Sequence, residues 1–99
     1  MKKRIILATD PGTTNPAIRN AITAFLEGKG WSIWHWFDDL WLIDGVPTSV
    51  GLGPLRDELR PLLPPSVRLL ILSAEGPMDH AGWVQQQSIP WITEHWLKK

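Results

Sequence analysis

The sequence feature that most constrains the fold is an aromatic stretch at residues 31–43, WSIWHWFDDLWLI. It holds four of the seven tryptophans of the chain, and the acidic pair Asp38 and Asp39 interrupts its apolar run. Aromatic and β-branched residues on both sides of a two-residue polar break are typical of a β-hairpin. We therefore predict strands near residues 31–37 and 40–43, joined by a turn, in the middle of a sheet.

Alternation along the first of these strands assigns its side chains to two faces. One face is expected to carry Ser32, Trp34 and Trp36, and the other Ile33, His35 and Phe37. Neither face is plainly polar. Asp44 and Gly45 are expected to close the second strand as a turn.

Two strands and two helices are predicted around the hairpin. Residues 4–9 and 67–72 are apolar on both faces, which is typical of strands covered on both sides. A helix is expected after Asn15 as N-cap and Pro16 as first residue, ending at Gly28 or Gly30. A second helix is expected over residues 54–63, and a short final helix over residues 88–98.

The predicted order β-α-β-β-α-β is that of a ferredoxin-like α+β fold with a C-terminal extension ending in a short helix. We predict one domain over residues 1–99, with the core at 1–73 and the extension at 74–99. In this fold both helices lie on one face of the sheet. Because the strands are apolar on both faces, the second face is expected to meet a partner, most simply a second copy of the chain.

Composition limits the classes of function. The formal net charge is zero, so nucleic acid would have to bind at a local patch. There is no cysteine, which excludes disulfides and thiolate chemistry and suits a reducing cytoplasm. No apolar run approaches the length of a membrane span, and no signal peptide is expected.

Several segments resemble the SinR family, whose relatives include the small ferredoxin-like CRISPR adaptation subunit and the virulence-associated D toxins. The resemblance is carried by the hairpin at residues 34–43, by residues 56–61 with 67–71, and by Ile89-Pro90 with Trp96-Leu97. Asp10 falls where the family has an aspartate at the end of its first strand. The similarity covers most of the chain.

This resemblance implies a ferredoxin-like homodimer. In the CRISPR relatives, the first-strand aspartates of two subunits lie near the dimer axis and are assigned a divalent metal for phosphodiester cleavage. Other members are non-catalytic scaffolds for nucleic acid. The resemblance thus implies Asp10 as a catalytic residue and Mg²⁺ ligand, in an endoribonuclease or endonuclease acting on RNA or DNA.

The residues around Asp10 also allow a structural role. Asp-Pro-Gly is typical of a turn, in which the carboxylate accepts hydrogen bonds from main-chain N–H groups. The segment after it, Thr13, Thr14 and Asn15, precedes a predicted helix, whose first N–H groups can bind a phosphate. Both alternatives stay open for each of these residues.

The tryptophans likewise allow two roles. Exposed aromatic rings stack on nucleic-acid bases, whereas buried ones form cores and interfaces. Because the chain lacks a basic stripe, we expect Trp34, Trp36 and Trp41 at a dimer interface.

Two hypotheses of function follow: a Mg²⁺-dependent nuclease or nucleic-acid-handling dimer with Asp10 at its axis, or a non-catalytic homodimeric scaffold. The scaffold would bind a protein partner or small ligand through its sheet or the loop at residues 73–88.

Overall fold

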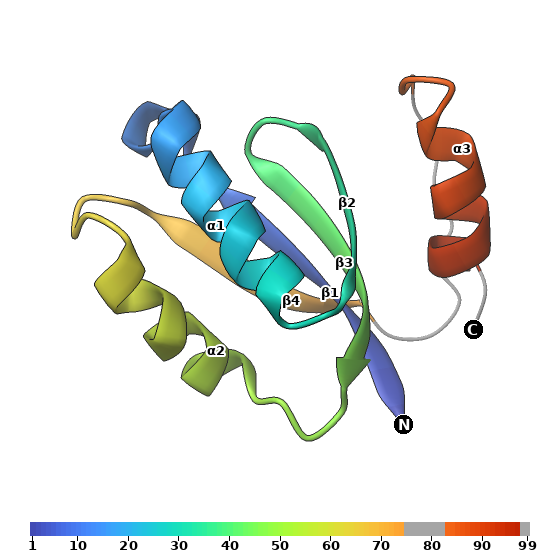
Figure 1. Ribbon diagram of the computed structural model, residues 1–99, viewed down its shortest axis with the longest axis horizontal. Helices are drawn as coiled ribbons and strands as arrows, with labels where there is room; N and C mark the ends of the chain where they lie inside the picture. The colour runs from blue at the N-terminus through green and yellow to red at the C-terminus, as the bar shows by residue number, and fades with distance from the viewer. Residues whose placement is uncertain (75–82, 98–99) are drawn as a thin grey trace.

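The computed structural model describes residues 1–74 and 83–97 (Figure 1). In chain order the elements are β1 (Lys2–Thr9), η1 (Pro11–Thr13), α1 (Pro16–Gly28), β2 (Ser32–Phe37), β3 (Leu40–Pro47), α2 (Leu52–Leu59), η2 (Arg60–Leu62), β4 (Leu69–Ala74), α3 (Ser88–Trp91) and η3 (Ile92–Leu97). The segments η1 and η2 are single turns of 3-10 helix, and η3 continues α3 as a π-helix. No helix in the described part of the chain is long and apolar enough to cross a membrane.

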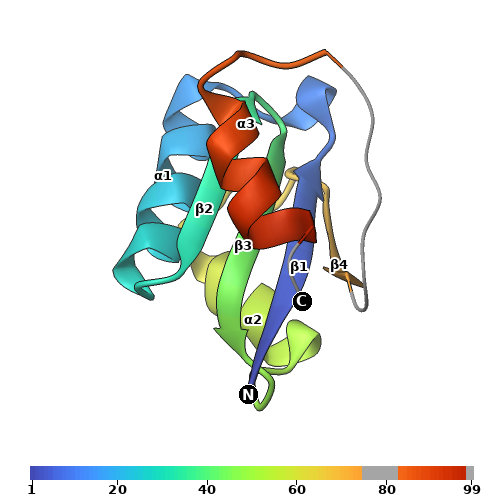
Figure 2. The same ribbon diagram turned by 90° about the vertical axis from the view of Figure 1, so that its right-hand side faces the viewer.

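The strands form one sheet in the order β2-β3-β1-β4, and every neighbouring pair is antiparallel. The predicted α+β class is confirmed, and the strands and helices follow one another in the predicted order. Helices α1 and α2 lie on one face of the sheet, which we call the inner face (Figure 1). Helix α3 lies on the opposite, outer face (Figure 2).

Helix α1 begins and ends as its sequence dictates. The Asn15 side chain accepts a hydrogen bond from the Ile18 N–H at 2.9 Å, and Pro16 is the first helical residue. The side chains of Ile22 and Leu26 on this helix are fully buried in the core. Gly30, with φ of +79°, follows the helix in the left-handed conformation that terminates helices.

The second helix and the last strand differ from their predicted bounds. Pro61 lacks the N–H that an α-helix needs, and the chain there forms the 3-10 turn η2 after α2 ends at Leu59. Strand β4 begins at Leu69, two residues later than predicted, and ends at Ala74. The predicted final helix is present as α3 and η3, which end at Leu97.

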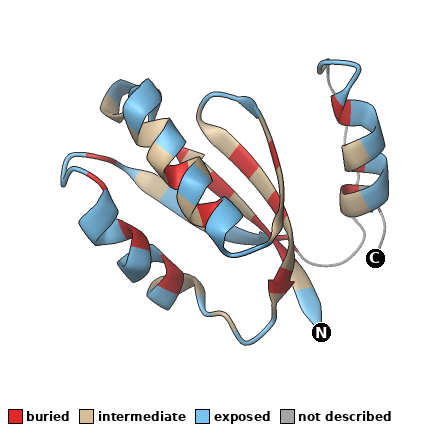
Figure 3. Ribbon diagram, in the orientation of Figure 1, coloured by how far each residue is buried: buried red, intermediate tan, exposed pale blue. Residues whose placement is uncertain are grey.

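Apolar side chains form one cluster on each face of the sheet. Figure 3 shows buried positions on the strands and on the helices that flank them. The inner cluster packs the sheet against α1 and α2, and its fully buried members are Ile5, Leu7, Ile22, Leu26, Trp41, Ile43, Val46, Leu55 and Leu59. The outer cluster packs the sheet against α3 and η3, and its buried members are Trp34, Ala74, Ile92 and Trp96. Helices therefore pack on both faces of the sheet, in keeping with its two-faced apolar pattern.

The element that packs on the outer face is not the one that we expected. We expected a second copy of the chain to meet this face, but the C-terminal helix of the same chain packs on part of it. Arg4 of β1 reinforces this packing: its guanidinium donates to the main-chain carbonyl of Trp96 and lies 5.5 Å from the centre of the Trp96 ring. Of the predicted extension, α3 and η3 thus pack on the sheet of the same chain.

Two irregularities change which side chains share a face. The register between β2 and β3 shifts between Trp34 and Phe37. As a result Phe37 contacts Trp34, with ring centres 5.1 Å apart, although simple alternation placed these residues on opposite faces. His35 instead stacks on the buried Trp41 ring at 4.2 Å.

The second irregularity corrects the predicted turn at Asp44 and Gly45. These two residues lie inside β3, where together they oppose Arg4 of β1. Gly45 has a φ of +82°, which permits a β-bulge in which two residues face one. Because of the bulge, Ile43 and Val46 both point into the inner cluster.

The positive φ of Gly45 makes a testable prediction. A Cβ at this position meets no atom within 4 Å, so Gly45→Ala strains only the main chain. We expect a loss of about 1–2 kcal/mol in the free energy of unfolding, measured by urea titration. Gly28→Ala is the matched control, because its Cβ is equally unobstructed and its helical main chain suits alanine. Equal effects of the two substitutions would contradict the bulge.

Candidate functional site

The predicted site residues gather at the end of β1, beside the turn of the β2–β3 hairpin. Asp10 follows β1 directly and is the N-cap of η1. Its N–H donates to the carbonyl of Arg68 at 3.0 Å, and the Thr9 N–H donates to the carbonyl of Asp39 at 3.0 Å. These bonds join the start of β4 and the hairpin turn to the end of β1.

The Asp10 carboxylate is engaged by its own chain. One oxygen accepts the N–H of Gly12 at 3.2 Å, and the other lies 3.6 Å from a guanidinium nitrogen of Arg68. The side chain is 44% exposed, on a shallow open hollow of about 240 Å³ that Arg68 also lines. This is the geometry of the turn-capping alternative.

Thr13, Thr14 and Asn15 also bond to protein groups. The Thr13 hydroxyl donates to the Asp10 carbonyl at 2.8 Å and accepts the Arg68 N–H at 3.1 Å. The Thr14 hydroxyl donates to the Asp39 carboxylate at 2.5 Å. Asn15 caps α1, as described above. The structure therefore brings all three residues together with Asp10, in roles that hold the turn in place.

Asp39 is the residue that the sequence did not single out at this site. Its Oδ1 accepts from the Thr9 hydroxyl at 2.6 Å, from the Thr14 hydroxyl and from Arg19 Nε at 3.4 Å. Its Oδ2 lies 3.3 Å from Arg19 Nη2. One carboxylate thus joins the hairpin turn to β1, to the loop before α1 and to α1 itself. The only sequence signal was the acidic pair at the hairpin turn.

These contacts decide the charge of Asp39. Burial of the carboxyl raises its pKa, but hydrogen bonds from Thr14, Thr9 and Arg19, together with the positive charge of Arg19, outweigh burial. The net effect lowers the pKa below its usual value of 3.8. A carboxyl with a lowered folded-state pKa stabilises the fold above the unfolded-state pKa and loses this contribution as the pH falls.

Asp39→Asn should therefore destabilise the protein at neutral pH. Loss of the charged hydrogen bonds is expected to cost about 1–2 kcal/mol in the free energy of unfolding. The difference from the unsubstituted chain should narrow as the pH falls from 3.8 through the lowered pKa of the native carboxyl, because the unfolded chain takes up the proton first. Urea titrations at several pH values measure both effects.

Asp38→Asn is the control for that substitution. The Asp38 side chain is 83% exposed and lies 3.9 Å from Arg19. We expect a change below about 0.5 kcal/mol at any pH. Equal losses in the two variants would contradict the role of Asp39 as the central acceptor.

The residues of one chain do not fit a Mg²⁺ site at Asp10. Magnesium prefers octahedral oxygen ligands, and here the Asp10 carboxylate already meets the Gly12 N–H and the Arg68 guanidinium. Within the described residues, no three His, Cys, Asp or Glu side chains are grouped so that they can hold a metal ion. Asp39, the other nearby acid, has its oxygens engaged by two hydroxyls and Arg19.

The three tryptophans expected at a dimer interface lie in different environments. Trp41 is fully buried in the inner cluster, with its indole N–H donating to Thr23 at 3.0 Å, and has no surface to offer a partner. Trp34 is covered by the C-terminal helix of its own chain. Trp36 is 49% exposed.

Of the loop predicted at residues 73–88, residues 75–82 lie outside the described part of the chain.

Comparison of the chain with protein-family models, with curated proteins and with solved structures finds no significant match. The similarity to the SinR family therefore stays a prediction. Function has to be argued from the geometry alone.

Proposed function

We propose that this chain is a ferredoxin-like protein that acts as a homodimeric binding scaffold, with Asp10 in a structural role. The strand order β2-β3-β1-β4, with α1 and α2 on one face, supports the ferredoxin-like assignment. It leaves the outer face available for contacts beyond the core. The C-terminal helix uses only part of that face.

The observation that carries the proposal is the apolar surface left on β4. Leu69 and Ile71 pack against the inner cluster, so by alternation Leu70 and Leu72 point to the outer face. Leu70 is 58% exposed and Leu72 is 47% exposed. Two large aliphatic side chains on an edge strand are typical of an interface. We therefore place the dimer contact at β4, and not at Trp34 or Trp41.

The contacts of Asp10 favour the scaffold over the Mg²⁺-dependent nuclease. Gly12 and Arg68 already engage the carboxylate, and a metal would have to displace both. The zero net charge adds no general attraction for RNA or DNA. A protein partner or small ligand fits this surface better than a nucleic acid does.

The dimer is tested by substituting the exposed leucines. Light scattering at micromolar concentration should give about twice the 11.2 kDa chain mass for the unsubstituted protein. Leu70→Lys combined with Leu72→Lys should give the monomer mass with unchanged circular dichroism, because charge repels a like surface. Leu62→Lys, at an equally exposed leucine on η2, should stay dimeric. A monomeric unsubstituted protein contradicts the proposal.

A nuclease assay tests the role of Asp10 separately. Purified protein is incubated with single-stranded RNA and with DNA, with Mg²⁺ and with a chelator, beside Asp10→Ala. We expect no cleavage under any condition, and a lower midpoint of thermal unfolding for Asp10→Ala because the cap of η1 is lost. Mg²⁺-dependent cleavage that disappears in Asp10→Ala would instead support the nuclease.

A further inference from the structure

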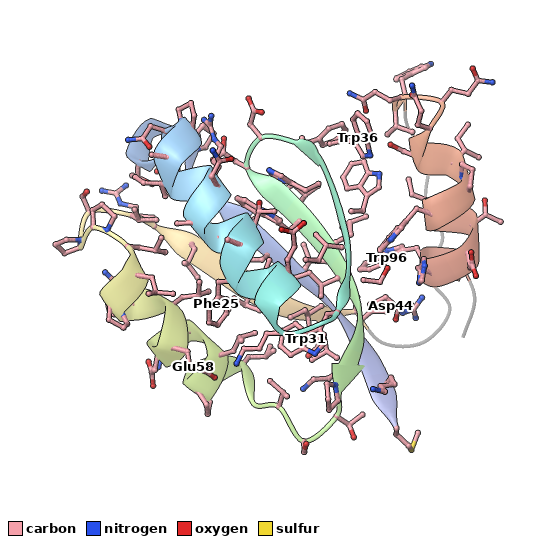
Figure 4. The ribbon with its side chains drawn as sticks, in the orientation of Figure 1. Phe25, Trp31, Trp36, Asp44, Glu58 and Trp96 are labelled. Atoms are coloured by element: carbon pink, nitrogen blue, oxygen red, sulfur yellow. The ribbon has the colours of Figure 1, made fainter. Side chains whose placement is uncertain are left out.

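A second polar cluster lies where the C-terminal helix meets the outer face of the sheet. Ser32 of β2 and Asp44 of β3 are cross-strand neighbours, and His95 of η3 contacts both. Asp44 lies on the same side of the sheet as Trp96 of the C-terminal helix (Figure 4). Three residues separated widely in sequence are thus brought together by the fold.

The imidazole of His95 lies between the carboxylate of Asp44 and the hydroxyl of Ser32. His95 Nδ1 lies 2.8 Å from Asp44 Oδ2, and His95 Nε2 lies 3.4 Å from Ser32 Oγ. An ionised carboxylate only accepts hydrogen bonds, so Nδ1 carries the imidazole proton. In the neutral imidazole, Nε2 then presents its lone pair to the serine hydroxyl. Separations somewhat above 3.2 Å are common where no substrate is bound.

Trp91 of α3 restricts how the serine hydroxyl can bond. Its indole N–H donates to Ser32 Oγ at 2.9 Å. Indole is only a donor, so it occupies a lone pair of the hydroxyl and leaves the hydroxyl proton for another acceptor. His95 Nε2 is the acceptor described at this position.

The cluster is within reach of solvent. The side chains of His95 and Asp44 are each 27% exposed, and Ser32 is half-buried. The Trp91 ring lies 4.7 Å from the His95 ring and forms an apolar wall beside it.

We propose that Ser32 is an activated nucleophile that accepts acyl groups from small activated esters, with His95 as general base and Asp44 as the residue that positions His95. Ser32 Oγ forms a bond to the ester carbonyl carbon while its proton passes to His95 Nε2. The ester C–O bond then breaks, and the leaving alkoxide takes that proton as an alcohol. Water cleaves the acyl-serine, gives its proton to Nε2, and Ser32 regains it. The site depends neither on the dimer nor on Asp10.

A fluorophosphonate probe tests the nucleophile directly. Ser32 Oγ attacks the phosphorus, fluoride leaves, and the serine proton passes to His95, so each chain gains one stable adduct. Intact-mass spectrometry should show a single adduct, and peptide fragmentation should place it on Ser32. This result needs only the unsubstituted chain. Absence of an adduct at Ser32, or equal labelling of several serines, would overturn the proposal.

Variants separate chemistry from structure. Ser32→Ala should abolish the adduct, and His95→Gln should lower the labelling rate at least about tenfold. Asp44→Asn should lower the maximal rate while the half-saturating probe concentration stays unchanged. Ser66→Ala, in an exposed turn, should match the unsubstituted chain. Circular dichroism confirms folding of each variant. Labelling of His95→Gln at the unsubstituted rate would show that the cluster only holds the helix.

Discussion

The structure depends on a sheet whose two faces are both apolar. In β1, Ile5 and Leu7 are fully buried under α1 and α2, while Ile6 and Arg4 face the C-terminal helix. Burying a large apolar side chain contributes about 1.5–3 kcal/mol, so leaving either face in water would remove much of the stability of a small domain. The chain meets this requirement by folding its last helix back over the sheet.

The two covers differ in kind. The inner cluster is almost wholly aliphatic and aromatic and excludes solvent from nine side chains. The outer one combines tryptophan packing with polar bonds: Arg4 to Trp96, Trp91 to Ser32, and His95 to Asp44. Within the described residues, the indole N–H of Trp34 and the hydroxyl of Ser88 have no hydrogen-bond partner there. Because this contact is partly polar and incomplete, it leaves polar side chains such as His95 partly exposed, and it leaves Leu70 and Leu72 uncovered on β4.

Asp10 and Asp39, at the end of β1, show that burial decides the role of an acidic side chain. Asp10 and Asp39 lie at the same end of the sheet, yet Asp39 is largely buried among donors and Asp10 is nearly half exposed. Asp39 holds three elements together through its charge, whereas Asp10 caps a turn. The scaffold and the reactive serine are therefore assigned to other surfaces, β4 and the junction with the C-terminal helix.

The sequence alone determined the element order, the α1 helix with its Asn15 cap, the hairpin and the absence of thiol chemistry, because these follow from local periodicity, turn residues and composition. It predicted the turn at Asp10 as one of two alternatives. Only the tertiary structure decided the faces of Phe37 and Val46, because single-residue bulges reverse alternation without a local signal. It also decided that the C-terminal helix covers part of the outer face, and that Asp39 meets Arg19 and Ser32 meets His95. Such contacts join residues 20 and 63 positions apart, and no local pattern encodes them.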